Sequence, residues 1–144
     1  MLSIVIIYCK KDQPILQRCI KSLPKWAEII IAETVPEKEW KINFVKEYGQ
    51  IKRYIINYPE GWFRFDTARN LAKSVATQEW ILSLDADEEL VKNQEEWLKR
   101  LLETTPDDIG AYFSTQFGVV NVLHQRGVAT RIATPIIRLS LIHI

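Results

Sequence analysis

The residues best placed to do chemistry in this sequence are Asp85 and Asp87, which come directly after the apolar run 80–84. Glu88 and Glu89 follow at once. Like charges this close raise one another's pKa or recruit a counter-ion, and Mg²⁺ or Mn²⁺ takes two carboxylate oxygens while keeping positions open for phosphate. An arbitrary Asp-x-Asp is more often a solvated acidic turn. Its position after a buried strand favours a divalent-metal site here.

Length and composition predict one globular domain, because 47% of the 144 residues are hydrophobic and 26% are charged. The 19 Lys and Arg nearly balance the 18 Asp and Glu, so no global field attracts nucleic acid. Cys9 and Cys19 have no Cys or His partner at metal-ligand spacing, and we expect reduced, packed thiols. A basic leader is absent, and no apolar stretch approaches the ~20 residues of a membrane span, so we expect no transmembrane segment and a cytoplasmic location.

Strands and helices should alternate over residues 1–104. Apolar runs at 2–8, 27–32, 51–57 and 79–84 favour buried strands. Helical spacing predicts helices that begin at Asp12, Asp66 and Asn93 and another over 36–48, with Gly49 at the carboxyl cap of the last. The inward residues expected of the 36–48 and Asn93 helices are Trp40, Phe44, Val45, Tyr48, Trp97, Leu98, Leu101 and Leu102.

After Pro106 the pattern changes to β-rich segments at 111–117, 119–123 and 136–139. We therefore expect a single domain over 1–144, in which 1–104 holds the βα units and 105–144 begins a β region. The alternation predicts an α/β fold with a mostly parallel central sheet flanked by helices. Its ligand crevice should lie at the carboxyl ends of the strands.

The strand ends supply the candidate site. Tyr8 and Lys10 follow the first strand, Glu33 follows the second, and Asp85 and Asp87 follow the fourth. If the sheet is parallel, these positions converge. A metal ion on Asp87, assisted by Asp85, would then bridge the two phosphates of a nucleotide diphosphate and neutralise charge on that leaving group.

Other side chains near these strand ends can contact the same ligand. Lys10 and Arg69 could add positive charge at the phosphates, Glu33 could accept a hydrogen bond from base or ribose, and Tyr8 could stack on the base. Taken singly, Lys10 is better explained as a solvated loop lysine and Tyr8 as an aromatic at the sheet margin. For Glu33 and Arg69, a structural and a functional role are about equally supported.

Two stretches of the sequence resemble a known family. Phe65–Ala72, followed by Glu79–Leu90, is similar to inverting glycosyltransferases of family 2, which have the GT-A fold and in which an "ARN" helix precedes "WILxLDADE". Residues 3–7 with 18–23, and 26–31, are similar to the family's first two βα units. The resemblance covers residues 1–104 and extends weakly to 137–139.

The resemblance implies transfer of a sugar from a nucleotide-diphosphate donor, commonly a UDP-sugar, with a divalent cation on the pyrophosphate. It makes Asp87 the metal ligand and Asp85 a contact to ribose or metal, with Ala86 between them in the nucleotide-sugar site. It also places Arg69 on the donor side and Glu33 where the family usually has a uridine-contacting aspartate. The implied acceptor is a glycan or a lipid-linked molecule, and a lipid-linked acceptor would bring the enzyme to a membrane.

The sequence departs from the family pattern at two points. In the family, a short Gly/Ser-rich turn that contains a second acid often follows the position of Glu33. Residues 34–37 of this sequence do not have that pattern, and the difference affects the expected recognition of the base. Relatives also continue past residue 139 into an acceptor half that carries the general base. No residue here fills that role, since His124 and His143 lie in no nucleophile or metal spacing. We therefore expect the donor-binding part of a longer enzyme, truncated near residues 140–144.

Two other functions remain open. The chain could be a non-catalytic or fragmentary module that binds a nucleotide-sugar or a protein partner. It could also be an aspartate-dependent Mg²⁺ phosphotransferase, although that class places its aspartate pair after the first strand and follows it with Thr or Val.

Overall fold

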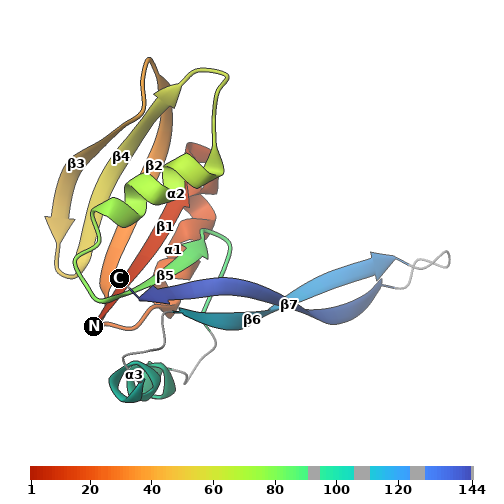
Figure 1. Cartoon of the computed structure of the whole chain (residues 1–144). Helices are drawn as coiled ribbons and strands as arrows, with labels where there is room; N and C mark the ends of the chain where they lie inside the picture. The colour runs from red at the N-terminus through yellow and green to blue at the C-terminus, as the bar shows by residue number, and fades with distance from the viewer. Residues whose placement is uncertain (91–94, 106–110, 124–128, 144) are drawn as a thin grey trace.

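The fold is a seven-stranded mixed sheet in the order β3-β4-β2-β1-β5-β7-β6 (Figure 1). The computed structural model describes residues 1–90 and 95–105 and the backbone of 111–123 and 129–143. Adjacent strands β4, β2, β1 and β5 are parallel, and the other three are antiparallel to their neighbours. The strands are β1 (Leu2–Tyr8), β2 (Glu28–Glu37), β3 (Lys41–Tyr48), β4 (Ile51–Pro59), β5 (Trp80–Asp85), β6 (Ala111–Leu123) and β7 (Ala129–His143).

Helices cover both faces of the parallel strands, which confirms the expected α/β class. Leu16 and Cys19 of α1 (Gln13–Ser22) pack on one face of β1, where α3 (Glu95–Thr104) adds Leu98 and Leu102. On the other face, Ala68 and Ala72 of α2 (Phe65–Ser74) pack with Val5 and Ile7. Every residue of β1 is buried, as its unbroken apolar run predicts for a central strand.

The start of α1 follows the sequence closely. Asp12 is its N-cap residue, and Pro14 lies in its first turn, where a missing backbone N–H breaks no helical hydrogen bond. The Asp12 carboxylate does not bond the helix itself. It accepts a hydrogen bond from the backbone N–H of Cys9 at 3.1 Å, which closes the one-turn 3₁₀ helix η1 (Lys10–Asp12). This turn joins β1 to α1.

The helix expected over 36–48 is wrong. Residues 28–37 extend β2, and residues 41–48 form β3, which pairs antiparallel with β4 and carries a β-bulge between Phe44 and Lys46. Trp40 and Ile42 pack against the core, whereas three of the four side chains that the helix would have turned inward are exposed. Exposed on β3 are Phe44, Val45 and Tyr48.

Gly49 belongs to a hairpin turn instead of a helix cap. It has φ of 60° between the paired residues Tyr48 and Ile51. Glycine adopts this left-handed backbone without the steric strain of a side chain. The two-residue connection sets the register of β3 on β4.

Two details of the other helices also differ from expectation. Arg64, and not Asp66, is the N-cap residue of α2, and Asp66 lies in the first turn with its carboxylate 2.8 Å from Arg64 Nη2. Trp97 of α3 is 59% exposed, because the buried stripe of that helix consists of Leu98 and Leu102. Asn93, expected to cap α3, lies outside the described residues. In the described part of the chain, no helix has the length and apolar character needed to cross a membrane.

The carboxyl-terminal strands form a hairpin that reaches away from the rest of the sheet (Figure 1). The segments expected at 111–117 and 119–123 are one strand, β6, which continues through Gly118. The short strand expected at 136–139 is part of the longer β7. Residues 141–143 of β7 pair with residues 80–82 of β5, so this hairpin completes the sheet beside the acidic strand.

We predict that Glu28→Gln destabilises the fold. Burial alone raises the pKa of Glu28, but hydrogen bonds from Lys52, Ser3 and Thr77 outweigh it and lower the pKa from 4.5 to about 2. Because the folded-state pKa is depressed, the stabilisation is complete above pH 4.5 and is lost as the pH falls toward 2. Urea unfolding at pH 7 should show a loss on the order of 3 kcal/mol.

The control for that variant is Glu103→Gln, which changes an exposed carboxylate on α3. It should leave the free energy of unfolding nearly unchanged. The difference between wild type and Glu28→Gln should also shrink in acid. A difference that stays constant from pH 7 down to pH 2 would contradict the assigned role.

We predict that Cys19 resists alkylation in the folded protein, although both cysteines are free thiols. Burial raises the pKa of the Cys19 thiol to about 12, and the carboxylates of Glu88, Glu89, Asp87 and Asp85 add to the rise. Iodoacetamide reacts with the thiolate. Peptide mass mapping at pH 8 should therefore find label on Cys9 alone until the chain is unfolded in urea, and Cys9→Ser should take up none beforehand. Equal labelling of both cysteines in the native state would contradict this.

Candidate functional site

The structure brings the expected ends of β1 and β5 together at one edge of the sheet, but Glu33 does not follow β2, because that strand continues to Glu37. β1 lies between β2 and β5, with Tyr8 opposite Glu33 and Ile7 opposite Asp85. Because all three strands run in the same direction, the carboxyl ends of β1 and β5 lie side by side and Glu33 of β2 is level with the end of β1, while β2 itself continues beyond them (Figure 1). This edge brings together Tyr8, Lys10, Glu33, Asp85 and the residues that follow Asp85.

The candidate residues are divided between the two faces of this edge. Tyr8 belongs to the buried cluster on the α1 face, and its partner Glu33 shares that face. Ile7 belongs to the cluster on the α2 face, and its partner Asp85 shares that one. Side chains alternate along a strand, so this division follows from the register alone. A ligand that contacts both carboxylates has to cross the rim of the sheet.

On the α2 face, Asp85 is paired with Arg69. Arg69 Nη2 lies 2.7 Å from Asp85 Oδ1, and the two side chains are 31% and 38% exposed. The same guanidinium lies over the ring of Phe65, 5.7 Å from its centroid. Both Phe65 and Arg69 lie on one side of the first turns of α2, four residues apart. The helix therefore places the positively charged Arg69 side chain at the end of β5.

The acidic loop after β5 is fastened to α1. Glu88 folds back so that its carboxylate accepts the backbone N–H of Asp85 at 2.7 Å, while its own N–H bonds the Asp85 carbonyl at 3.0 Å. Arg18 Nη2 lies 2.8 Å from Glu89 Oε1. The Leu90 N–H donates to the Ser22 hydroxyl at 3.0 Å. Glu88 thus has a structural role in shaping the turn.

On the α1 face, Glu33 is held by two neighbours. Arg53 Nη2 donates to Glu33 Oε2 at 3.0 Å, and the Tyr8 hydroxyl donates to the same oxygen at 3.3 Å. Burial raises the pKa of the Tyr8 hydroxyl; the Arg53 guanidinium opposes that rise, and the Glu33 carboxylate adds to it. Within the described residues, Arg53 Nε is buried and has no hydrogen-bond partner. Sequence reasoning missed Arg53, because a lone arginine in a strand carries no local signal.

The remaining residues expected in the site differ in exposure. Lys10 is exposed on the turn after β1, and Ala86 is buried on the α1 face beside Leu84. Asp87 is exposed beyond the end of β5. Tyr8 is only 4% exposed, so its ring presents no open face to a nucleobase. The stacking role expected of Tyr8 does not fit this placement, and its hydroxyl acts on Glu33 instead.

The carboxylate oxygens of Asp85 and Asp87 suit a hard divalent cation, but they do not complete its coordination sphere. Asp85 and Asp87 supply carboxylate oxygens, the ligands that Mg²⁺ and Mn²⁺ prefer. Among residues 1–90 and 95–105, no three His, Cys, Asp or Glu side chains are grouped to hold a metal. Mg²⁺ is commonly held by one or two carboxylates together with substrate phosphates. The pair therefore fits a site that the ligand itself completes.

Aromatic residues flank the α2 side of this edge. Contacts run from Trp40 through Tyr58 and Phe63 to Phe65, with centroid separations between 4.8 and 6.3 Å. Trp62, the loop tryptophan, is 75% exposed, and Phe65 is 63% exposed. These packed rings fix the loop that leads into α2 and thereby the position of Arg69.

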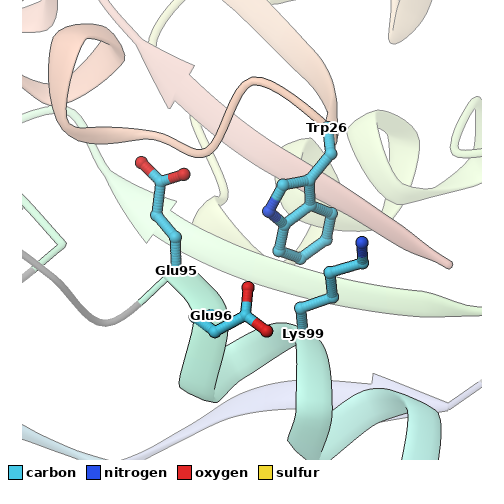
Figure 2. A pocket seen from close by; sticks show the side chains of 4 residues that line it. All are labelled: Trp26, Glu95, Glu96 and Lys99. Carbon is cyan, nitrogen blue, oxygen red and sulfur yellow. The ribbon is translucent and has the colours of Figure 1, made fainter.

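A pocket of about 490 Å³ lies elsewhere, between α3 and the segment that precedes β2. Figure 2 shows the Trp26 ring beside Lys99, with the Glu95 and Glu96 carboxylates around the same opening. Because Trp26 precedes β2, this pocket is at the amino-terminal end of the parallel strands. It is separate from the Asp85 edge.

Known proteins resemble this chain in sequence and in fold. Residues 3–131 match the family model described as glycosyl transferase family 2. The lipopolysaccharide core biosynthesis glycosyltransferase LpsC of Rhizobium meliloti (strain 1021) is 29% identical over 104 residues, which are 72% of this chain and 38% of LpsC. The crystal structure of S. aureus TarS 1–349 has a TM-score of 0.52 and 13% identity, and the match covers 71% of this chain and 32% of TarS.

The likeness to TarS supports the GT-A-like fold. The chain spans about two fifths of the length of LpsC, so it corresponds to part of that protein. The family model, in contrast, covers most of the chain and includes the strands, α2 and the acidic loop that build the carboxyl edge. This chain belongs to glycosyl transferase family 2.

Proposed function

We propose that this chain binds a nucleotide-diphosphate sugar, with a UDP-sugar as the first candidate, and forms the donor-binding part of a glycosyltransferase. The observation that carries the proposal is the Arg69–Asp85 ion pair of 2.7 Å, with Asp87 two residues further on. A planar guanidinium suits phosphate oxygens, and neighbouring carboxylates suit a divalent cation. Both lie at the edge where open α/β sheets bind ligands.

The residues of the two faces would contact different parts of the donor. On the α2 face, Arg69 would donate hydrogen bonds to the diphosphate, and Asp87 with Asp85 would hold Mg²⁺ or Mn²⁺. That cation would neutralise charge on the leaving diphosphate. On the α1 face, Glu33 would accept a hydrogen bond from the base or ribose, because Arg53 and Tyr8 fix its carboxylate. Lys10 would add positive charge from the turn after β1.

The acceptor and the stereochemistry complete the proposal. LpsC is named for lipopolysaccharide core biosynthesis, which supports a glycan or lipid-linked acceptor here as well. Inversion at the anomeric carbon follows from the resemblance to inverting members of the family. We assign the general base to no residue of this chain, and we propose a cytoplasmic location, beside a membrane where the acceptor is lipid-linked.

We predict that UDP binds more tightly with Mn²⁺ than without it, and that Asp87→Ala removes the difference. The reason is that the cation would join the carboxylate to the diphosphate. Isothermal titration of UDP with and without Mn²⁺ measures both effects. Glu103→Ala, which removes an exposed carboxylate from α3, is the matched control and should behave as wild type. An absence of UDP binding in wild type under both conditions would favour the interaction module.

We predict that Arg69→Ala weakens the binding of UDP more than that of uridine. The guanidinium would face phosphate, which uridine lacks, and losing a charge-assisted contact of this kind typically reduces affinity about tenfold or more. Parallel titrations with the two ligands measure the ratio. Equal losses for UDP and uridine would assign Arg69 a purely structural role.

A further inference from the structure

We propose that the pocket between α3 and the segment before β2 binds a sugar ring of a glycan, as a second site remote from the donor edge. The pocket has a volume of about 490 Å³, and the described residues that line it are Trp26, Glu95, Glu96 and Lys99 (Figure 2). Pockets that hold small ligands are typically about 300–1,000 Å³, so its size suits a saccharide. The inference goes beyond the proposed donor site and does not depend on it.

One wall of the pocket is the Trp26 ring, which its neighbours hold in place. Pro24 and Ala27 are buried, and the Ala27 N–H donates to the Pro24 carbonyl at 3.3 Å. The Gln50 side-chain amide donates to the same carbonyl at 3.4 Å. Trp26 itself packs against the buried cluster on the α1 face and stays partly exposed. The indole is therefore positioned before a ligand arrives, which lowers the entropic cost of binding.

The other wall is α3, which packs against the same cluster. Leu98 and Leu102 are each 7% exposed and belong to the cluster that Trp26 contacts. Glu95 and Lys99 lie one turn apart on the flank of α3 that borders the pocket. Because both walls rest on one buried cluster, the opening between them keeps its shape.

The charged groups around the indole do not neutralise one another. A Glu that precedes a Lys by four residues on a helix is well placed to form an ion pair. Among the described residues, Glu95 and Lys99 form none, although Glu96 lies 3.6 Å from Arg100 at the same spacing. Figure 2 shows the Glu95 carboxylate on one side of the indole and the Lys99 amine on the other. A hydrogen-bond acceptor and a donor thus stay available beside an aromatic ring.

The lining disfavours ligands that are charged or wholly apolar. An anion would meet the two glutamate carboxylates, and an organic cation would lie beside the Lys99 ammonium. An apolar molecule would remove all three charged side chains from water. A metal ion would gain nothing from the indole, and among residues 1–90 and 95–105 no three His, Cys, Asp or Glu side chains are grouped to hold one.

A sugar ring uses every group of the lining. One face of a pyranose consists of C–H groups, which can pack flat on the indole. Its hydroxyls donate hydrogen bonds to carboxylates such as Glu95 and accept them from an ammonium such as Lys99. A neutral molecule of this kind needs no compensating charge. The combination of groups therefore points to a saccharide.

The position of the pocket decides what this site could do. Trp26 precedes β2, so the pocket lies at the amino-terminal end of the parallel strands, whereas Asp85 lies at their carboxyl end. A sugar ring held here does not reach a diphosphate at the other end. The site would therefore hold a distant unit of a long glycan and keep the protein bound to it, without taking part in sugar transfer.

Saturation-transfer difference NMR tests the site in the absence of nucleotide and metal. The probes are the methyl glycosides of glucose, galactose and mannose, and lipopolysaccharide core oligosaccharide. We expect wild type to bind at least one probe, and Trp26→Ala to weaken that binding about tenfold because the stacking surface is lost. Glu95→Ala changes an exposed side chain and should weaken the same probe about three- to tenfold, so the test does not depend on the folding of Trp26→Ala alone.

The matched control is Trp97→Ala, which removes a tryptophan from the same helix. Trp97 is 59% exposed and does not line the pocket, so this variant should bind the probe as wild type does. Trp26→Tyr is the second variant, because it keeps an aromatic ring and should retain most of the affinity. Circular dichroism of each variant checks that the fold is intact.

The outcomes separate this inference from the proposed function. If no probe binds wild type, or if Trp26→Ala and Trp97→Ala bind equally well, the sugar site is wrong. Binding of choline at Trp26 in place of the saccharides would make this a cation site and would also overturn the inference. Because the probes carry no nucleotide, a protein that binds saccharide at Trp26 but binds no UDP keeps this site and loses the proposed donor site.

Discussion

The parallel pairing of β1 with β2 on one side and with β5 on the other is the constraint on which the rest of this structure depends. It requires crossover helices, and these bury β1 from both faces. It also places the carboxyl ends of β1 and β5 next to one another, with Glu33 of β2 level with the end of β1. The register of these strands then decides that Glu33 and Asp85 lie on opposite faces of the sheet.

The sequence predicted those parts of the molecule in which local pattern and tertiary environment agree. The unbroken apolar runs of β1 and β5 are typical of strands buried on both sides, and both strands lie in the middle of the sheet. The stripe of Leu16 and Cys19 is the buried face of α1. Since parallel strands end at a common edge, the placement of Tyr8 and Asp85 at that edge could be inferred without coordinates, whereas the continuation of β2 beyond Glu33 could not.

The failures arise where two periodicities fit the same residues. Trp40, Phe44 and Tyr48 are spaced four apart, which favours a helix, but Trp40, Ile42 and Phe44 also alternate, which favours a strand. Pairing with β4 decides between them, and partners such as Asn57 for Lys41 and Ile56 for Ile42 leave no mark on the local pattern. Two roles in the candidate site also depend on contacts that the local sequence pattern does not show. Arg53 reaches Glu33 from the neighbouring strand, and Glu88 turns onto the Asp85 backbone, so both roles depend on contacts that only the folded chain creates.

The outer position of β3 has a consequence for how molecules of this protein meet. The strand is the last in the sheet order and exposes Phe44 and Tyr48, a combination that invites a second chain to extend the sheet. The β-bulge between Phe44 and Lys46 interrupts the regular ladder at the middle of the strand, and Lys41 and Lys46 add positive charge along it. The irregular twist and the mutual repulsion of the ammonium groups make this edge strand a poor template for intermolecular strand addition. Hydrophobic side chains can therefore be exposed on β3 without favouring amyloid-like stacking.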